Sequence, residues 1–170
     1  FKGTFIMEMS RGCANRCGFC LASYLNLPLR SVPYDELIKT INLGLSYTDN
    51  IALLGAQISA QPRFHDVCKY IYDKIQSGED IKMSVSSLRV DAMTEDVVKT
   101  LTAAGQKNST LAIEAGSDRL RKVINKNLSE EQIFNAVQIA RDNGLKGLKF
   151  YGMIGLPTET EDDINAIIDL

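Results

Sequence analysis

The sequence lacks the features of a membrane or secreted protein. No apolar run approaches the length that a membrane-spanning helix needs, and the N-terminus is not a secretory signal. The net charge of -2 at pH 7 leaves no basic footprint for nucleic acid over the whole chain. We therefore expect a cytoplasmic protein without a membrane partner, and the sequence leaves contact with nucleic acid open.

Cysteine and histidine are also scarce. The chain has four cysteines and one histidine, His65, and without a secretory signal the thiols are expected to stay reduced. Hydrophobic residues make up 45% of the 170 residues, which is enough for the core of one domain. We expect residues 1–170 to form one domain. Because the last predicted helix stops without a cap, we interpret the chain as a fragment of a longer protein.

Short apolar runs alternate with amphipathic segments. Strands are predicted at residues 4–9, 50–55, 81–87, 109–116 and 147–155, and helices at residues 33–45, 63–78, 94–105, 117–124, 129–144 and 158–170. Thr94 is a predicted N-cap, and Ser129 with Gln132 forms a predicted capping box. Five strands, each followed by a helix, predict an α/β fold with a parallel sheet, either open and doubly wound or a barrel. In both folds ligands bind beyond the carboxyl ends of the strands.

Three cysteines follow the first predicted strand. Cys13, Cys17 and Cys20 have the spacing C-x3-C-x2-C, whereas Cys68 lies on a predicted helix, where we expect a buried small hydrophobe. A disulfide would leave one thiol unpaired, and a structural zinc site needs a fourth ligand, which His65 on a helix face does not supply. Buried structural cysteines do not suit a loop that contains Gly and Arg. A 4Fe–4S cluster on three thiolates would keep one iron open for a small molecule.

The cysteine loop, with Phe19 directly before Cys20, resembles that of the radical S-adenosylmethionine (radical SAM) superfamily. The stretches IEAGSDRLRKVINK and FYGMIGLPTETEDDI are similar to the branch that contains methylthiotransferases, oxygen-independent coproporphyrinogen oxidase and many cobalamin-binding-domain fusions. The resemblance implies a partial, TIM-like (β/α) barrel. About five βα units are present, and the C-terminal part of the barrel is expected to lie outside this fragment.

The resemblance also implies an enzyme whose cofactors are a 4Fe–4S cluster and S-adenosylmethionine. In the family, reductive cleavage of S-adenosylmethionine yields a 5′-deoxyadenosyl radical that abstracts hydrogen from a substrate, which the sequence does not identify here. The implied partners are a reductant such as flavodoxin or ferredoxin and further domains of the full-length chain. An iron–sulfur electron-transfer module and a structural metal-binding domain are the rival interpretations.

Residues after the second and third predicted strands are candidate cofactor contacts. Gly55 and Gln57 occupy the place where the family often has a Gly-Gly-Glu stretch that meets the methionyl amine. Gln57 replaces the acid but can accept a hydrogen bond through its amide oxygen. Ser84 and Ser86 share one strand face, and an inward orientation would bring both hydroxyls to the opening of the barrel.

Arg89, Glu114 and Ile154 complete the predicted cofactor contacts. The planar guanidinium of Arg89 suits a carboxylate, either of the cofactor or of Glu114. A buried Glu114 needs a partner, for which a cofactor amine, a ribose hydroxyl and Arg89 are the alternatives. The resemblance implies that Ile154, within a glycine-rich strand end, lies against the adenine ring.

Several charged residues have simpler interpretations. Arg119, Arg121 and Lys122 are expected on a solvated helix face. Arg11 is expected beside the cysteine loop, where it could tune the charge of a cluster.

Overall fold

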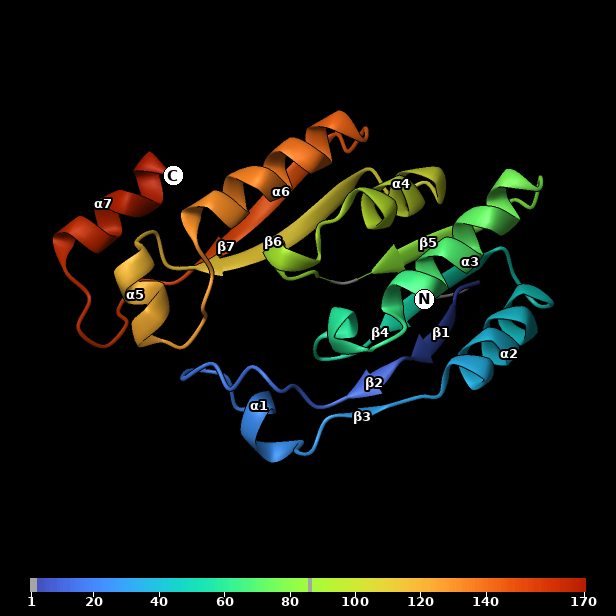
Figure 1. Ribbon diagram of the computed structural model, residues 1–170, viewed down its shortest axis with the longest axis horizontal. Coiled ribbons are helices and arrows are strands. Elements are labelled where there is room, and N and C mark those ends of the chain that lie inside the picture. Colours follow the sequence, from blue (N-terminus) through green and yellow to red (C-terminus); the bar gives the residue numbers. More distant parts are fainter. Residues whose placement is uncertain (1–2, 86) are drawn as a thin grey trace.

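The computed structural model describes residues 3–85 and 87–170 and contains five parallel strands (Figure 1). They are β1 (Phe5–Glu8), β4 (Asn50–Leu54), β5 (Lys82–Val85), β6 (Asn108–Glu114) and β7 (Gly147–Gly152). One sheet has the order β1-β4-β5, and β6 pairs with β7. A parallel bridge between Leu88 and Leu111 connects the two groups. The five predicted strands are confirmed, and their ladder follows the order of the chain.

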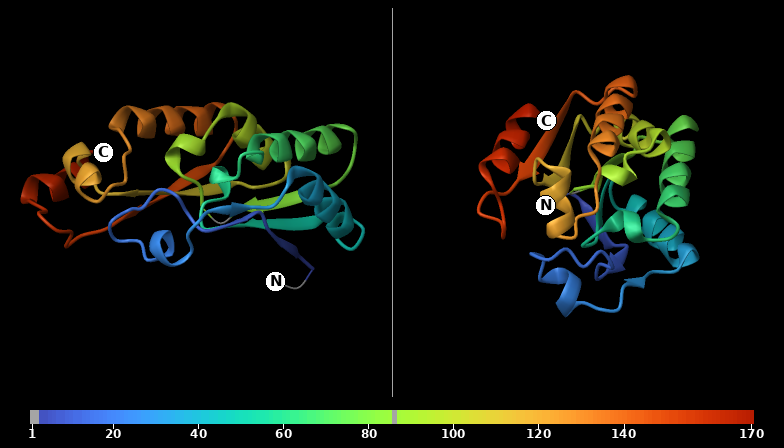
Figure 2. Two further views of the ribbon diagram at one scale, coloured as in Figure 1. Left: turned by 60° about the horizontal axis from the view of Figure 1, so that its bottom comes forward. Right: turned by 60° about the vertical axis from the view of Figure 1, so that its left-hand side comes forward.

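Helices cover one side of this sheet. They are α2 (Tyr34–Leu45), α3 (Phe64–Gln76), α4 (Glu95–Ala103), α6 (Glu130–Asp142) and α7 (Glu161–Asp169). The short helix α5 (Asp118–Val123) lies beyond the carboxyl end of β6 (Figure 1). In Figure 2 the helices α2, α3, α4 and α6 lie side by side along one face, and the sheet curves away from them without closing within the described residues. This one-sided arrangement is a partial (β/α) barrel and not a doubly wound sheet.

A short ribbon and a single helical turn lie between β1 and α2. The strands β2 (Ser10–Arg11) and β3 (Arg30–Ser31) pair in antiparallel orientation, and α1 (Ala22–Leu25) lies between them in the chain. The sequence pattern did not predict these elements, because two-residue strands and a single helical turn are too short to show a hydrophobic period. The cysteine loop runs from β2 to α1 and lies beyond the carboxyl ends of the strands (Figure 1).

The core lies between the sheet and the helices. Along β6 the buried residues Ser109, Leu111 and Ile113 alternate with less buried ones, which turns every second side chain toward α4 and α6. Leu111 and Leu101 of α4 have no exposed surface. The other face of β6 is therefore free to carry polar side chains.

Side-chain caps mark the starts of α5 and α6. Ser129 and Gln132 form the predicted capping box of α6, and Ser117 caps α5 by accepting from the Leu120 amide. Thr94 holds the N-cap position of α4, but its side chain makes no capping hydrogen bond. Among the described residues, none of the helices has the length and apolarity to cross a membrane.

Candidate cofactor site

A pocket of about 190 Å³ lies where the cysteine loop meets the carboxyl ends of the strands. The loop, the ends of β4, β5 and β6, and the turn after α5 contribute its lining: Cys13, Asn15, Cys17, Phe19, Cys20, Ser23, Ala56, Gln57, Ser87, Leu88, Arg89, Ala112, Glu114 and Lys126. Seven of the residues singled out in the sequence therefore line one cavity, although they come from four separate parts of the chain.

Two of the candidate contacts are not brought into this pocket, and a third lies outside the described residues. Gly55 and Ile154 are not among the lining residues, and Ile154 is 72% exposed. Ser86 lies outside the described residues, and its neighbour Ser87 lines the pocket. Gly55 serves close packing: a Cβ there would lie 3.1 Å from the Ser10 hydroxyl oxygen.

The cysteine loop folds around two left-handed residues. Gly12 has φ +95, and a Cβ at this position would overlap the Asn26 carbonyl oxygen, so only glycine fits. Arg16, between the first two cysteines, has φ +52. These turns place Cys13 and Cys17 where only 8% and 7% of each residue is exposed, and Cys20 is more open.

Gln57 holds the loop from the end of β4. Its Oε1 atom accepts a hydrogen bond from the Cys13 thiol at 3.3 Å and another from Asn15 Nδ2 at 2.5 Å. The amide oxygen that the sequence offered as an acceptor is therefore used within the protein, on the cysteine loop itself.

Glu114 and Lys126 form a buried ion pair on the pocket wall. The Lys126 Nζ atom lies 3.0 Å from Glu114 Oε1, and the side chains are 8% and 12% exposed. Glu114 has φ +70 at the end of β6, where the β6–β7 register shifts. Sequence reasoning missed Lys126. The available signal was its position between Asn125 and Asn127, since asparagine is enriched in the left-handed region that both residues adopt here.

Arg89 does not pair with Glu114, which corrects one of the alternatives offered for it. Its Nε atom lies 3.0 Å from Asp91 Oδ1, and both terminal nitrogens donate to the Lys126 carbonyl at 3.3 Å. The Glu114 carboxylate pairs with Lys126 instead. Arg89 binds the backbone of the turn that carries Lys126.

The charges around the pocket act on the cysteine thiols. Burial raises the pKa of the Cys17 thiol, while the positive charges of Lys126 and Arg89 oppose this rise because they favour the thiolate. For Cys68, in the core, burial raises the pKa to about 12, and the charge of Asp96 adds to the effect. Positive charges that partly offset the effect of burial thus lie beside Cys17, whereas Cys68 has no such charge beside it and Asp96 adds to its rise.

The expectation of a solvated face for the arginines of α5 is wrong for Arg121. This side chain is fully buried, and its guanidinium donates to the carbonyls of Ala115, Gly116 and Leu128 at 2.7–2.8 Å. Two carbonyls just after β6 and one just before α6 accept from it, so the buried guanidinium is satisfied. It fixes the backbone on both sides of the Glu114–Lys126 pair.

Arg11 and Arg119 both form ion pairs, but with partners in different parts of the fold. Arg11 is exposed beside the loop and pairs with Glu8 at 2.6 Å. Arg119 pairs with Asp163 of α7, and this ion pair, together with a hydrogen bond from Ser117, holds the pKa of the Asp163 carboxyl well below its usual range. Asp163 thus joins α7 to the loop after β6.

The donor set of the pocket fits an iron–sulfur cluster. Within residues 3–85 and 87–170, no three His, Cys, Asp or Glu side chains converge as they would on a single metal ion. A cubane cluster instead spreads its thiolate ligands over separate irons. The hydroxyl of Ser23, buried in the same pocket, has no hydrogen-bond partner among the described residues, so a polar group of the site is left for a ligand.

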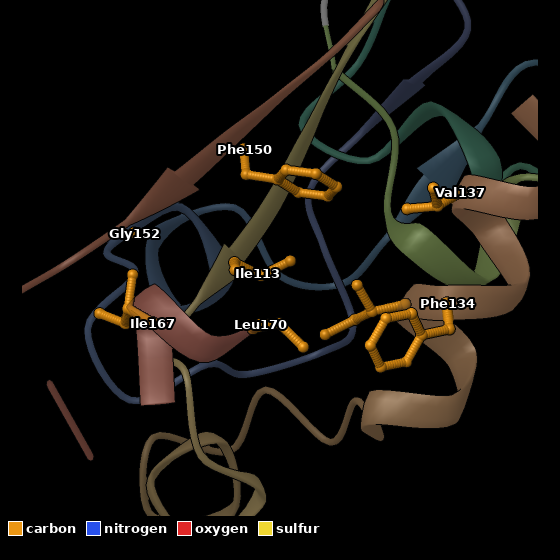
Figure 3. A pocket seen from close by; sticks show the side chains of 8 residues that line it. Ile113, Phe134, Val137, Phe150, Gly152, Ile167 and Leu170 are labelled. Atoms are coloured by element: carbon orange, nitrogen blue, oxygen red, sulfur yellow. The ribbon is translucent and has the colours of Figure 1, made fainter. Parts of the chain in front are cut away.

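A second cavity lies on the opposite face of β6 and β7. It measures about 290 Å³, and Figure 3 shows its apolar lining from the two strands, α6 and the C-terminal helix: Ile113, Ile133, Phe134, Val137, Phe150, Gly152, Ile167 and Leu170. It carries no titratable side chain and belongs to the helix-facing side of the sheet. The chemistry of the chain is therefore concentrated in the cysteine pocket.

A family model and curated relatives match this chain. The model of the radical SAM superfamily matches residues 7–170. An uncharacterized protein of Methanocaldococcus jannaschii is 34% identical over 169 residues, covering 98% of this chain and 36% of the relative. The tRNA-2-methylthio-N(6)-dimethylallyladenosine synthase of Carboxydothermus hydrogenoformans is 23% identical over 171 residues. The match covers 94% of this chain and 38% of that relative. The chain thus spans little more than a third of these relatives.

Solved structures share the fold. The radical SAM methyltransferase TsrM from Kitasatospora setae, with cobalamin and a [4Fe-4S] cluster bound, has a TM-score of 0.78 at 16% identity and covers 98% of this chain and 34% of that one. Coproporphyrinogen III oxidase (HemN) from Escherichia coli has a TM-score of 0.64 at 14% identity. The match covers 98% of this chain and 40% of that one.

Proposed function

Because the chain belongs to the radical SAM superfamily, we propose that residues 1–170 form the core of an enzyme that cleaves S-adenosylmethionine reductively at a 4Fe–4S cluster. The observation that carries the proposal is the meeting of Cys13, Cys17 and Cys20 with polar side chains from three strand ends in one pocket. Such convergence at the carboxyl ends of parallel strands is where barrel enzymes place their reactive groups.

The three thiols would hold the cluster. Three thiolates leave one iron without a protein ligand, which gives S-adenosylmethionine a place to bind. When bound, the reduced cluster supplies the electron that cleaves S-adenosylmethionine into methionine and a 5′-deoxyadenosyl radical. The positive charges of Lys126 and Arg89 partly offset the rise in the pKa of the Cys17 thiol that burial causes.

The Glu114–Lys126 pair would receive the zwitterionic end of S-adenosylmethionine. The ammonium of Lys126 can bind its carboxylate, while the carboxylate of Glu114 accepts from its amine or from a ribose hydroxyl. Both side chains line the pocket beside the cysteines. Because each is already paired with the other, neither is a lone buried charge before the cofactor arrives.

Apolar groups would complete the cofactor contacts. Phe19 lines the pocket and is 41% exposed, so its ring can cover the cofactor from the loop side. Ile154, 72% exposed after β7, offers an apolar side chain for the adenine. Gly55 would act by letting β4 pack closely against Ser10.

The substrate and partners would be met by other parts of the full protein. Relatives are named as tRNA methylthiotransferases, and structural neighbours bind cobalamin. The chain spans about a third of such proteins, so we assign substrate contacts and the remaining barrel units to segments outside it. The electron would come from a cytoplasmic reductant such as flavodoxin or ferredoxin.

An iron–sulfur electron-transfer module is the second candidate. A cluster that only carries electrons is usually held by four protein ligands. Cys68 is fully buried on α3 and does not line the pocket. The geometry therefore favours a cluster with one open iron over a fully ligated one.

Product analysis tests the proposal. The full-length protein is reconstituted without oxygen, reduced with dithionite and incubated with S-adenosylmethionine. We expect 5′-deoxyadenosine and methionine from the wild type and neither from Cys17→Ala. Absence of the nucleoside from full-length protein that carries its cluster would contradict the proposal.

A further inference from the structure

The turn after α5 is joined to the cysteine loop by three hydrogen bonds. The Nδ2 atom of Asn125 donates to the carbonyl oxygens of Asn15 at 3.0 Å and Arg16 at 2.9 Å. The Gly18 amide donates to the Ile124 carbonyl at 2.8 Å. These bonds connect segments more than a hundred residues apart in the sequence.

The Asn125 side chain is oriented for this contact. Asn127 donates to the Asn125 Oδ1 atom at 2.7 Å, which directs the Nδ2 group toward the loop. Asn125 itself has φ +54, a conformation that asparagine tolerates better than most residues. Although the residue is exposed, both its amide ends have partners within the protein.

The two carbonyls that Asn125 binds lie between the first two cysteines. Arg16, the residue before Cys17, has φ +52, and its carbonyl is turned outward to meet the amide. The conformation of this short segment determines how far apart the thiols of Cys13 and Cys17 lie. Fixing its carbonyls therefore fixes the spacing of two of the three candidate ligands.

On the other side of Asn125 the chain leads directly into the pocket. Lys126 points its ammonium at Glu114, with 3.0 Å between Nζ and Oε1. One turn thus holds the cysteine loop through a side-chain amide and supplies the next residue to the pocket wall.

We propose that Asn125 is a positioning residue for the cysteine loop: its amide holds the Cys13–Cys17 segment in the conformation that receives the cluster and keeps it in register with Lys126. The inference rests on the proposed function for its cluster, but the positioning itself is a property of the protein without cofactor. Its role needs the two amide protons, not only a residue that accepts a positive φ.

Two substitutions separate these requirements. Asn125→Asp is isosteric and tolerates a positive φ, but it has no donor and places a carboxylate opposite two carbonyls. Asn125→Gly keeps the backbone conformation and removes the side chain. Asn143→Asp is the matched control, because the Asn143 amide donates only within its own helix, to the Ile139 carbonyl at 2.9 Å.

The first measurement uses full-length protein without its cluster. The rate at which a thiol reagent labels Cys13 and Cys17 reports how the loop is held, while the melting temperature reports the fold. Two hydrogen bonds at the usual net strength correspond to on the order of tenfold in a loop-opening equilibrium. We expect labelling about tenfold faster in Asn125→Asp and Asn125→Gly, and unchanged in Asn143→Asp.

The second measurement follows loss of iron from reconstituted protein in the presence of a chelator. Both Asn125 variants should lose iron about tenfold faster than the wild type and the Asn143 control. Wild-type labelling and iron-loss rates in Asn125→Gly would overturn the proposal, as would equal changes in the control. If the wild type takes up no 4Fe–4S cluster, the proposed function fails, and the labelling rates still decide the role of Asn125.

Discussion

The cysteine loop and the helix that carries Cys68 present the same residue type in two opposite environments. Cys68 has no exposed surface and lies on α3 in the main core, where burial raises the pKa of its thiol to about 12. Cys17 lies in a polar pocket, where Lys126 and Arg89 oppose the effect of burial on its pKa. The spacing of the cysteines separated the candidate ligands from the core residue, and the charges around Cys17 agree with that separation.

The backbone shows the same contrast. Five described residues other than glycine have a positive φ, and four of them surround the pocket: Arg16, Glu114, Asn125 and Asn127. The helices that pack on the core contain none of the five. Unfavourable backbone conformations are concentrated where the cofactor would bind, and the core supplies the packing that sustains them.

Replacing the loop cysteines should have the largest effect. We expect Cys13→Ala, Cys17→Ala and Cys20→Ala each to lose the 4Fe–4S cluster completely, because a cubane needs its thiolates. Iron and acid-labile sulfide are counted on each anaerobically reconstituted variant, beside the wild type.

Cys68→Ala is the matched control for this panel. It should keep the cluster and lower the melting temperature, since it removes a packed sulfur from the core. If one of the loop variants keeps a full cluster and Cys68→Ala loses it, the assignment is wrong. Cys68 would then be a ligand, and the replaced loop cysteine would not.

Breaking the Glu114–Lys126 pair should have the next largest effect. Lys126→Met leaves the Glu114 carboxylate buried without a partner, which costs about 3–5 kcal/mol of unfolding free energy. Glu114→Ala should weaken S-adenosylmethionine binding by about 1–3 kcal/mol, the range for losing a buried charged hydrogen-bond partner. Denaturant unfolding measures the loss of stability in Lys126→Met, and calorimetric titration measures the affinity of Glu114→Ala for S-adenosylmethionine.

The double variant Lys126→Met/Glu114→Gln sharpens this prediction. It removes both charges, so it should recover much of the stability that Lys126→Met loses without recovering cofactor affinity. Cluster content should stay at the wild-type level in all three variants, because the thiolates alone build the cluster. If affinity for S-adenosylmethionine is unchanged throughout, the pair is only a structural support of the barrel.

The order of strands and helices could be predicted from the sequence because each element carries a hydrophobic period and a boundary signal. The cysteine loop could be predicted because its spacing is local. Lys126 could not, since its partner Glu114 lies across a turn whose path depends on the positive φ of Asn125. Arg121 was misread because the carbonyls that bury it belong to a strand end and to the start of α6.

The central claim is that three thiolates hold a cluster with one iron left open for S-adenosylmethionine. Mössbauer spectroscopy of full-length protein, reconstituted with isotopically enriched iron, tests this most directly. We predict a 4Fe–4S spectrum in which one iron site separates from the others when S-adenosylmethionine is added. A 4Fe–4S spectrum that does not respond to S-adenosylmethionine at all, or a protein that binds no such cluster, would contradict the account.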